Sequence, residues 1–317
     1  MKSKSAVEKQ NPLLEVKNLT TRFDLKTGLF GKIYGRVHAV ENVSFDIYPG
    51  ETFALVGESG CGKSTIARSI MHLDKPVSGS IRFNGKETLG LSPRQLQATR
   101  RNIQMIFQDP FSSLNPRMTI GKAIADPLAV NAVVPQSKLR ERVGHLLERV
   151  DLEQDHMDRY PHAFSGGQRQ RICIARVLGL DPKLIIADEA VASLDVTIQA
   201  KVINLLMDLQ SDLGISMLFI SHDIAVVERI AHRVAVMYLG EIVEIGNRQS
   251  IFRNPQHSYT NKLFSSVPVP DPRKRTKDRK LKVDEIPSVL RAPDFMPVEL
   301  PMRQVSDTHF VREEAGV

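Results

Sequence analysis

A run of nine residues has the composition and spacing of a phosphate-binding loop. It consists of Gly57, Glu58, Ser59, Gly60, Cys61, Gly62, Lys63, Ser64 and Thr65. The three glycines permit a tight curl in which successive backbone N–H groups point into one concavity. Lys63 can reach the β- and γ-phosphates of a nucleoside triphosphate, and the hydroxyl of Ser64 can ligate Mg²⁺. We therefore expect this loop to bind a nucleoside triphosphate.

Two adjacent carboxylates follow a later apolar run. Asp188 closes the run 184–187, and Glu189 comes next. A carboxylate at the carboxyl end of a parallel strand, beside a phosphate loop, suits Mg²⁺ ligation, either directly or through water. Glu189 is then positioned to polarise a water molecule for attack on the γ-phosphate. Taken alone, the pair would also suit the start of a helix; together with the phosphate loop it favours a catalytic role.

A second candidate phosphate site begins at a serine. Ser165, Gly166, Gly167 and Gln168 stand where a helix is expected to start, and a helix N-terminus with small residues suits an anion. The plainer interpretation is a helix capped by serine. That interpretation does not account for both glycines and the following amide.

The elements that must position these residues are strands and helices in βα alternation. Strands are predicted at 13–16, around Phe23, and at 43–47, 52–56, 80–83, 103–107, 184–187, 217–220, 234–238 and 241–244; helices are predicted at 66–73, 198–213 and 224–231. A glycine-rich hairpin is expected around Gly28, Gly31 and Gly35. Residues 120–152 show a helical period instead, which predicts a helical subdomain inserted into the strand-rich core.

The bulk composition is that of an ordinary globular protein. The 317 residues are 42% hydrophobic and 25% charged, and two cysteines cannot build a disulfide framework. No apolar run is long enough to span a membrane, and no apolar signal-peptide core follows the basic start. We therefore expect the protein to stay in the compartment where it is made, with both thiols reduced.

The net charge of +7 comes largely from one tract, residues 271–283, in which seven basic residues stand against two acidic ones. A solvated linker is the first interpretation of this tract. Attraction to anionic lipid headgroups is the second and nucleic-acid binding the third.

Taken together, the motifs resemble those of the nucleotide-binding subunit of an ATP-binding cassette (ABC) transporter over roughly residues 13–265. They occur in that family's order: the phosphate loop, the glutamine loop at Gln108, the signature Ser165–Gln168, the Walker B pair Asp188 and Glu189, the D-loop 193–195, and the switch His222. The implied fold is α/β, with a P-loop NTPase (RecA-like) core, an antiparallel β subdomain and an inserted α-helical subdomain. The implied ligands are ATP and Mg²⁺.

The resemblance also implies a role for each motif. Two cassettes would pack head to tail, so that the signature of one completes the ATP site of the other and Asp195 lies across the interface. Gln108 would sense Mg²⁺ and the attacking water, and His222 would hold the γ-phosphate and the base in register. Phe23 is expected to stack on adenine, with Tyr34 as the alternative.

Two departures from the family pattern leave the chemistry intact. Ala190 stands where Pro is common, and Phe164 stands where Leu is usual. Neither change removes a catalytic group, so we expect a site competent for hydrolysis. Cys61 lies inside the phosphate loop, where its thiol could make the enzyme sensitive to alkylation.

Three segments are similar to the peptide and nickel importer branch: 108–117, 195–200 and 254–260. Ser258 stands where that branch commonly has a second Pro, and the tail lacks the cysteine cluster that many members carry. The end of the chain, residues 286–311, looks like that of glutathione-importer ATPases. The expected function is ATP-driven peptide import, with a nickel or other small-solute importer of the same branch as the alternative.

The expected partners are a second ABC ATPase subunit, two transmembrane permease subunits and, indirectly, an extracytoplasmic solute-binding protein. The expected location is the cytoplasmic face of the inner membrane. A soluble ABC ATPase acting on nucleic acid is disfavoured, because no long coiled coil interrupts the cassette; a small-molecule kinase has no use for the signature. The expected domains are a flexible lead-in (1–12), an ABC ATPase domain (13–264, with a helical subdomain at about 110–165) and a Pro-rich basic C-terminal extension with little periodicity (265–317).

Overall fold

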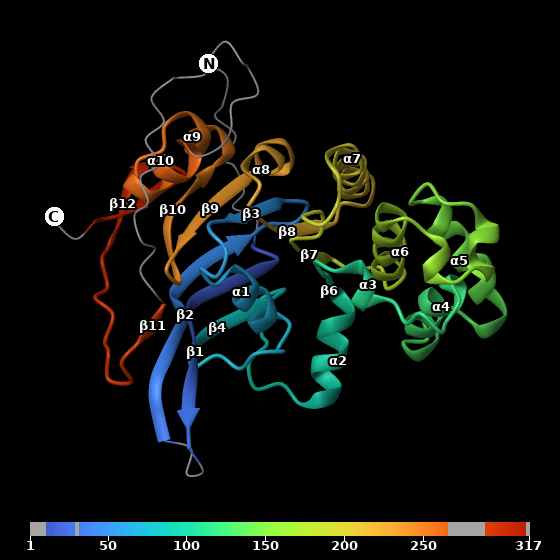
Figure 1. Cartoon of the computed structure of the whole chain (residues 1–317), viewed down its shortest axis with the longest axis horizontal. Coiled ribbons are helices and arrows are strands. Elements are labelled where there is room, and N and C mark those ends of the chain that lie inside the picture. Colours follow the sequence, from blue (N-terminus) through green and yellow to red (C-terminus); the bar gives the residue numbers. More distant parts are fainter. Residues whose placement is uncertain (1–10, 29–31, 266–288, 315–317) are drawn as a thin grey trace, which may run out of the picture.

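Two β-sheets organise the protein, whose computed structural model describes residues 11–28, 32–265 and 289–314 (Figure 1). The main sheet has eight strands in the order β12-β13-β10-β9-β3-β8-β7-β6, and the second sheet has five in the order β11-β2-β1-β4-β5. Helices accompany the sheets, and α4 and α5 lie together beyond the β6 end of the main sheet (Figure 1). The predicted α/β fold class is confirmed.

The main sheet has a parallel centre. Its strands are β3 (Thr52–Val56), β6 (Ile103–Ile106), β7 (Leu184–Asp188), β8 (Ser216–Ser221), β9 (Arg233–Tyr238), β10 (Glu241–Asn247), β12 (Met302–Ser306) and β13 (His309–Arg312). Strands β6, β7, β8, β3 and β9 run parallel, and β10, β13 and β12 are antiparallel to their neighbours. Every residue of β3, β7 and β8 is buried, which is why these segments read as continuous apolar runs.

The second sheet is antiparallel throughout. Its strands are β1 (Leu14–Thr27), β2 (Lys32–Ile47), β4 (Ser78–Phe83), β5 (Lys86–Glu87) and β11 (Leu290–Arg291). The two strands predicted at the N-terminus are one strand, β1, whose register shifts near Asn18 break the alternation that the sequence shows. The predicted hairpin is confirmed by the pairing of Thr27 with Lys32. Phe45 and Phe53 stack at 5.0 Å in the cluster that joins the two sheets.

Helices lie at the predicted positions, and three more, at 93–102, 248–253 and 258–265, lie where no helix was predicted. The helices are α1 (Lys63–Ile70), α2 (Pro93–Asn102), α3 (Pro110–Ser113), α4 (Ile120–Val130), α5 (Leu139–Glu148), α6 (Gly166–Leu178), α7 (Val196–Leu213), α8 (Ile224–Ile230), α9 (Arg248–Arg253) and α10 (Ser258–Ser265), with 3₁₀ turns at Gln136–Lys138, Gln154–Asp158 and Pro161–Ala163. Helix α2 was not predicted, because it buries none of its residues and so shows no apolar period. Its start is set by the capping box of Ser92 and Gln95 instead.

The helical period at 120–152 corresponds to α4 and α5, whose apolar faces pack together. One buried cluster contains Ile124, Leu128, Val143 and Leu147 together with residues of α6 and α7. This group lies between β6 and α6 in the chain, and therefore between the predicted glutamine loop and the signature.

The C-terminal segment differs from the expectation. The sequence of 265–317 shows little periodicity and predicts no strand there, yet residues 289–314 contain β11, β12 and β13. Strand β11 pairs with β2 through Leu290 and Val37, and β13 pairs with β10 through Phe310 and Ile245. The reason is tertiary: the free edges of β2 and β10 supply hydrogen bonds that a strand of two to four residues could not find alone.

Some expectations fall outside the described residues. These are the lead-in up to residue 10, the tip of the hairpin at Gly31 and the basic tract 271–283. Across residues 11–28, 32–265 and 289–314, none of the helices combines the length and the apolar character that crossing a bilayer requires.

Candidate functional site

The predicted phosphate loop connects β3 to α1, and its backbone requires glycine. Gly57 and Gly62 have φ angles of 152° and 110°, which favour residues without a Cβ. A Cβ at Gly62 would collide with the carbonyl oxygen of Ala39, and one at Gly57 would collide with that of Met237. The neighbouring backbone therefore closes around the loop, and only glycine fits at these two positions.

Lys63 lies folded back over the loop. Its Nζ donates to the carbonyl oxygens of Gly57 and Glu58, each at 2.8 Å, and lies 3.7 Å from Sγ of Cys61. The Lys63 side chain is buried, and its hydrogen bonds to these two carbonyl oxygens offset the loss of hydration of its ammonium group. The arrangement puts a positive charge at the N-terminus of α1, where an anion is favoured.

Ser64 and Asp188 bring a hydroxyl and a carboxylate together. The Ser64 Oγ donates to Oδ1 of Asp188 at 2.9 Å. Burial at the end of β7 raises the pKa of Asp188, and the Ser64 hydrogen bond opposes that rise. Oxygen ligands of these two types are those that Mg²⁺ prefers, so the residues present fit the ion.

Glu189 and His222 lie side by side at the ends of neighbouring strands. The Nδ1 of His222 is 3.3 Å from Oε1 of Glu189. Glu189 has a left-handed backbone with φ of 48°, and its N–H donates to the carbonyl of Ile220 at 3.0 Å. A non-glycine residue in this region costs free energy and is held by its surroundings, a condition that recurs at functional sites.

The register of the main sheet explains why these groups meet. Val56 lies opposite Ser221, and Asp188 lies opposite Ile220, so the carboxyl ends of β3, β8 and β7 share one edge. The structure therefore brings together the phosphate loop, Asp188, Glu189 and His222 from segments far apart in the sequence. This edge is where parallel α/β sheets bind ligands.

The signature segment lies in a different packing neighbourhood. Helix α6 packs on α3, α4, α5, α7 and β6, whereas α1 packs on β1, β2 and β7. Ser165 caps α6 by accepting the N–H of Gln168, and Gln168 Oε1 accepts the N–H of Ser165. A Cβ at Gly167 would collide with Ile198 of α7, while one at Gly166 would meet only Leu194 at 3.7 Å.

The other predicted residues are placed as follows. Gln108 is exposed after β6, and its carbonyl accepts from Ser193 Oγ at 3.5 Å, which links the glutamine loop to the D-loop. Asp195 caps α7 by accepting the N–H of Ile198 at 3.0 Å. Phe23 on β1 and Tyr34 on β2 both expose their rings, so either remains available to a nucleotide base.

One contact to the phosphate loop was missed by sequence reasoning. The hydroxyl of Tyr259, in α10, accepts the backbone N–H of Glu58 at 3.0 Å. In the sequence, the segment 254–260 indicates only the peptide and nickel branch. No local pattern in that segment marks the contact, because its partner lies 201 positions away in the chain.

Comparisons with known proteins add a family and relatives. Residues 40–192 match the ABC transporter family, and residues 243–294 match the family described as "Oligopeptide/dipeptide transporter, C-terminal region". The glutathione import ATP-binding protein GsiA of Pectobacterium atrosepticum is 56% identical over 300 residues, which are 95% of this chain and 48% of that protein. GsiA of Escherichia coli K12 is 55% identical over 302 residues, again 95% and 48%. The chain thus spans about half the length of these curated relatives.

Solved structures with the same fold include two ATP-binding cassettes. The post-hydrolysis dimer of the cassette MJ0796, bound to ADP and phosphate, has a TM-score of 0.65 at 29% identity and covers 74% of this chain and 98% of that one. The structure of cbiO1 from Clostridium perfringens, part of the ABC transporter complex cbiONQ, has a TM-score of 0.67 at 31% identity and covers 77% and 92%.

Proposed function

Since this chain belongs to the ABC transporter family of ATP-binding cassettes, we propose that it binds and hydrolyses ATP to drive import of di- or oligopeptides, or of glutathione-like peptides, across a bacterial cytoplasmic membrane. One observation carries the choice of cargo. Its relatives named as glutathione import proteins are 55–56% identical over 95% of this chain. The match of residues 243–294 to the oligopeptide and dipeptide transporters supports the same branch.

ATP binding is assigned to the phosphate loop. Lys63 leaves the carbonyls of Gly57 and Glu58 to contact the β- and γ-phosphates, and the N–H groups of the loop surround them. Phe23 stacks on the adenine, with Tyr34 as the alternative. Ser64, Asp188 and Gln108 would hold Mg²⁺, which when bound neutralises charge on the β- and γ-phosphate oxygens.

Hydrolysis is assigned to Glu189 with His222. The Glu189 carboxylate orients a water molecule and accepts its proton as the water attacks the γ-phosphate. His222 Nδ1 lies within reach of Glu189 Oε1 and keeps that carboxylate aimed. The exposed side of the His222 ring remains free for the γ-phosphate, since 55% of its side chain is accessible.

Assembly as a pair is assigned to the signature. Ser165, Gly166, Gly167 and Gln168 contact the nucleotide of a second ABC ATPase subunit, and Asp195 lies at the interface between the two. The separate packing of α6 and α1 supports this assignment, because the signature and the phosphate loop of one chain belong to different neighbourhoods.

The proposed domains and partners are as follows. Residues 13–264 form the ATPase domain, with a helical subdomain at about 110–165, and the loop at Gln108 contacts the membrane partner, which consists of two permease subunits. A solute-binding protein on the far side of the membrane delivers the cargo. The ATPase itself works at the cytoplasmic face.

The test is transport by the assembled complex. The chain is co-expressed with its second ATPase subunit and the two permease subunits, and the complex is reconstituted in proteoliposomes with a solute-binding protein. It is then supplied with ATP and with labelled glutathione, a dipeptide or Ni²⁺. We expect ATP-dependent uptake of glutathione or the dipeptide, and none with Lys63→Ala. Uptake of Ni²⁺ alone would overturn the peptide assignment, and ATPase activity that Lys63→Ala leaves unchanged would overturn the nucleotide site.

A further inference from the structure

Tyr259 holds one peptide group of the phosphate loop. Its hydroxyl accepts the N–H of Glu58 at 3.0 Å, and the carbonyl of Glu58 accepts from Lys63 Nζ at 2.8 Å. Tyr259 is only 6% exposed, and burial raises the pKa of its hydroxyl, so this hydroxyl stays neutral at physiological pH. The loop is therefore fixed from the side of α10 at the residue that also holds the lysine.

The ring of Tyr259 packs against the ring of a second tyrosine. Its centroid lies 4.1 Å from that of Tyr238, with 31° between the ring planes. Tyr238 ends β9, which pairs with β3 directly before the phosphate loop. Truncating the Tyr259 hydroxyl alone would leave this aromatic contact in place.

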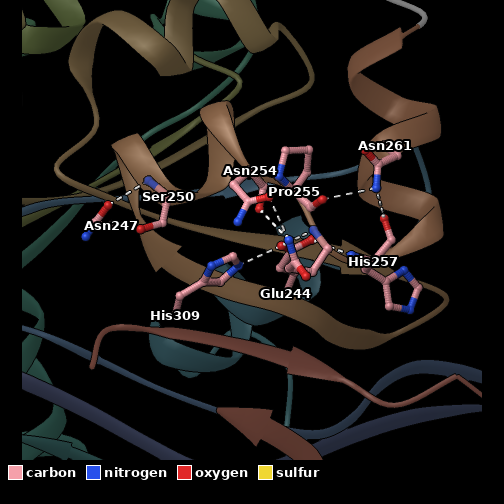
Figure 2. Close-up of polar contacts among 9 residues, drawn as sticks. Glu244, Asn247, Ser250, Asn254, Pro255, His257, Asn261 and His309 are labelled. Atoms are coloured by element: carbon pink, nitrogen blue, oxygen red, sulfur yellow. Dashed lines mark hydrogen bonds and ion pairs between the residues drawn. The ribbon is translucent and has the colours of Figure 1, made fainter. Parts of the chain in front are cut away.

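A buried carboxylate fixes the segment that leads into α10. Glu244, in β10, has no exposed surface and accepts the backbone N–H groups of Gln256 at 2.8 Å and His257 at 3.1 Å (Figure 2). Its Oε1 is also 2.7 Å from Nε2 of His309, in β13. Glu244 therefore links the backbone at 256–257 to the His309 ring of the C-terminal segment.

The next two N–H groups of the same segment are also taken by side chains. Ser258 donates to Oε1 of Glu314 at 2.7 Å, and Tyr259 donates to Nδ1 of His257 at 3.1 Å. Four successive N–H groups at the start of α10 thus have side-chain acceptors, and one of these acceptors follows β13. The first turn of a helix has no backbone acceptors of its own, so these contacts decide where α10 begins.

From these contacts we propose that Tyr259 is a positioning residue for the ATP site, and that the C-terminal segment holds it in place. Strand β13 brings His309 to Glu244 and brings Glu314 to Ser258; both fix the start of α10 and so the position of the Tyr259 hydroxyl. The C-terminal segment, far from the motifs in sequence, is then part of the nucleotide site. The inference rests on the proposed binding of ATP at the phosphate loop.

The first test compares Tyr259→Phe with Tyr238→Phe in the full chain. Each variant removes one phenol hydroxyl from the same aromatic pair, but only the first removes the bond to Glu58. We expect Tyr259→Phe to raise the KM for ATP about fivefold, with kcat at saturating ATP changed less than about twofold. Hydrogen exchange, followed by mass spectrometry on peptides that contain residue 58, should be faster in Tyr259→Phe only.

The outcomes of that test are separable from those of the proposed function. If the wild-type chain binds no ATP, the proposed function fails. If the wild type binds ATP while Tyr259→Phe has an unchanged KM and unchanged exchange, or if Tyr238→Phe shows equal changes, only the present inference fails. A fall in melting temperature without a change in KM indicates a purely structural role and also overturns it.

A second comparison tests the C-terminal segment. Glu314→Ala removes the acceptor of the Ser258 N–H, and Glu313→Ala removes the neighbouring exposed carboxylate without touching that bond. We expect Glu314→Ala to raise the KM for ATP about twofold and to speed exchange at residues 256–259. Equal behaviour of the two variants would contradict the participation of the C-terminal segment.

Discussion

Glu189 and His222 meet because two parallel strands end in register. Strands β7 and β8 pair with Asp188 opposite Ile220, and the Glu189 N–H donates to the Ile220 carbonyl. The left-handed backbone of Glu189 then turns its carboxylate to within 3.3 Å of His222 Nδ1. The position of the proposed base is thus set by the sheet and not by the flexible ends of loops.

The first prediction concerns the proposed base. Glu189→Gln keeps the shape of the side chain but cannot accept the proton of the attacking water. We expect ATP binding to persist within about threefold, and hydrolysis to fall by at least about 100-fold. Steady-state ATPase assays and equilibrium binding of a fluorescent ATP analogue check this, and size-exclusion chromatography with ATP should show an accumulated dimer. Wild-type turnover by this variant would contradict the assignment.

The second prediction separates two neighbouring glycines of the signature. Gly167→Ala places a Cβ against the branched Ile198 side chain, so we expect a loss of about 1–3 kcal/mol in the free energy of unfolding. Gly166→Ala meets only Leu194 at ordinary contact distance, so its stability should stay within about 0.5 kcal/mol of wild type.

Gly166→Ala should nevertheless lose ATPase activity, because it adds a methyl group where the partner's nucleotide is proposed to lie. Denaturant unfolding and ATPase assays on both variants check the pair. In mixed dimers with a Lys63→Ala subunit, the site completed by the altered signature should be the inactive one. Full activity of Gly166→Ala would count against the signature assignment.

The third prediction follows from the raised pKa of Asp188. Burial raises that pKa above its ordinary 3.8, so ionisation of Asp188 lowers the free energy of unfolding. This loss of stability is complete once the pH exceeds the pKa of Asp188 in the folded state. Asp188→Asn removes the charge and can still accept from Ser64. Without nucleotide, the variant should therefore be more stable than wild type at pH 7, and the difference should vanish as the pH falls below about 3.8, where both side chains are neutral. Its Mg²⁺-dependent ATPase activity should be lost.

Thermal unfolding of both proteins from pH 3 to pH 8 measures this difference directly. Because every other group is shared, the comparison isolates residue 188. A wild type more stable than Asp188→Asn at pH 7 would show that the carboxylate has contacts that outweigh its desolvation.

The fourth prediction concerns Cys61. Its thiol is buried behind the loop, and burial raises its pKa, with Lys63 nearby opposing that rise. We expect a maleimide at pH 7 to react at least about tenfold more slowly than with a free cysteine peptide, and more slowly still with ATP present. Labelling, once complete, should abolish ATPase activity, because the reagent cannot fit inside the loop.

The Cys173→Ala variant makes this measurement specific, since the chain has only two cysteines. Burial also raises the pKa of Cys173, to about 11. Mass spectrometry reports the extent of labelling, and activity is assayed on the same sample. Rapid labelling would contradict the burial of Cys61. Full labelling with activity intact would contradict the argument that the reagent cannot fit inside the loop.

Sequence reasoning could propose the groups with chemistry because their types and spacing carry the signal. The glycines of the phosphate loop, the pair Asp188 and Glu189, and the buried parallel strands are all local patterns. It missed α2, none of whose residues is buried, and it missed the strands of the C-terminal segment, whose partners lie elsewhere in the chain.

By itself, the sequence determined the fold class, the family and the order of the motifs. Each motif is recognised from residues close together in the chain, and the family follows from the motifs and their order. Only the tertiary structure decided which motifs meet: strand register brings Asp188, Glu189 and His222 to the phosphate loop, while α6 packs elsewhere. It also decided that Tyr259 touches Glu58 and that Glu244 binds His309, which lies 65 positions away in the chain. Such contacts arise from the burial of polar groups, which must find hydrogen-bond partners wherever the fold supplies them, and no local pattern records that requirement.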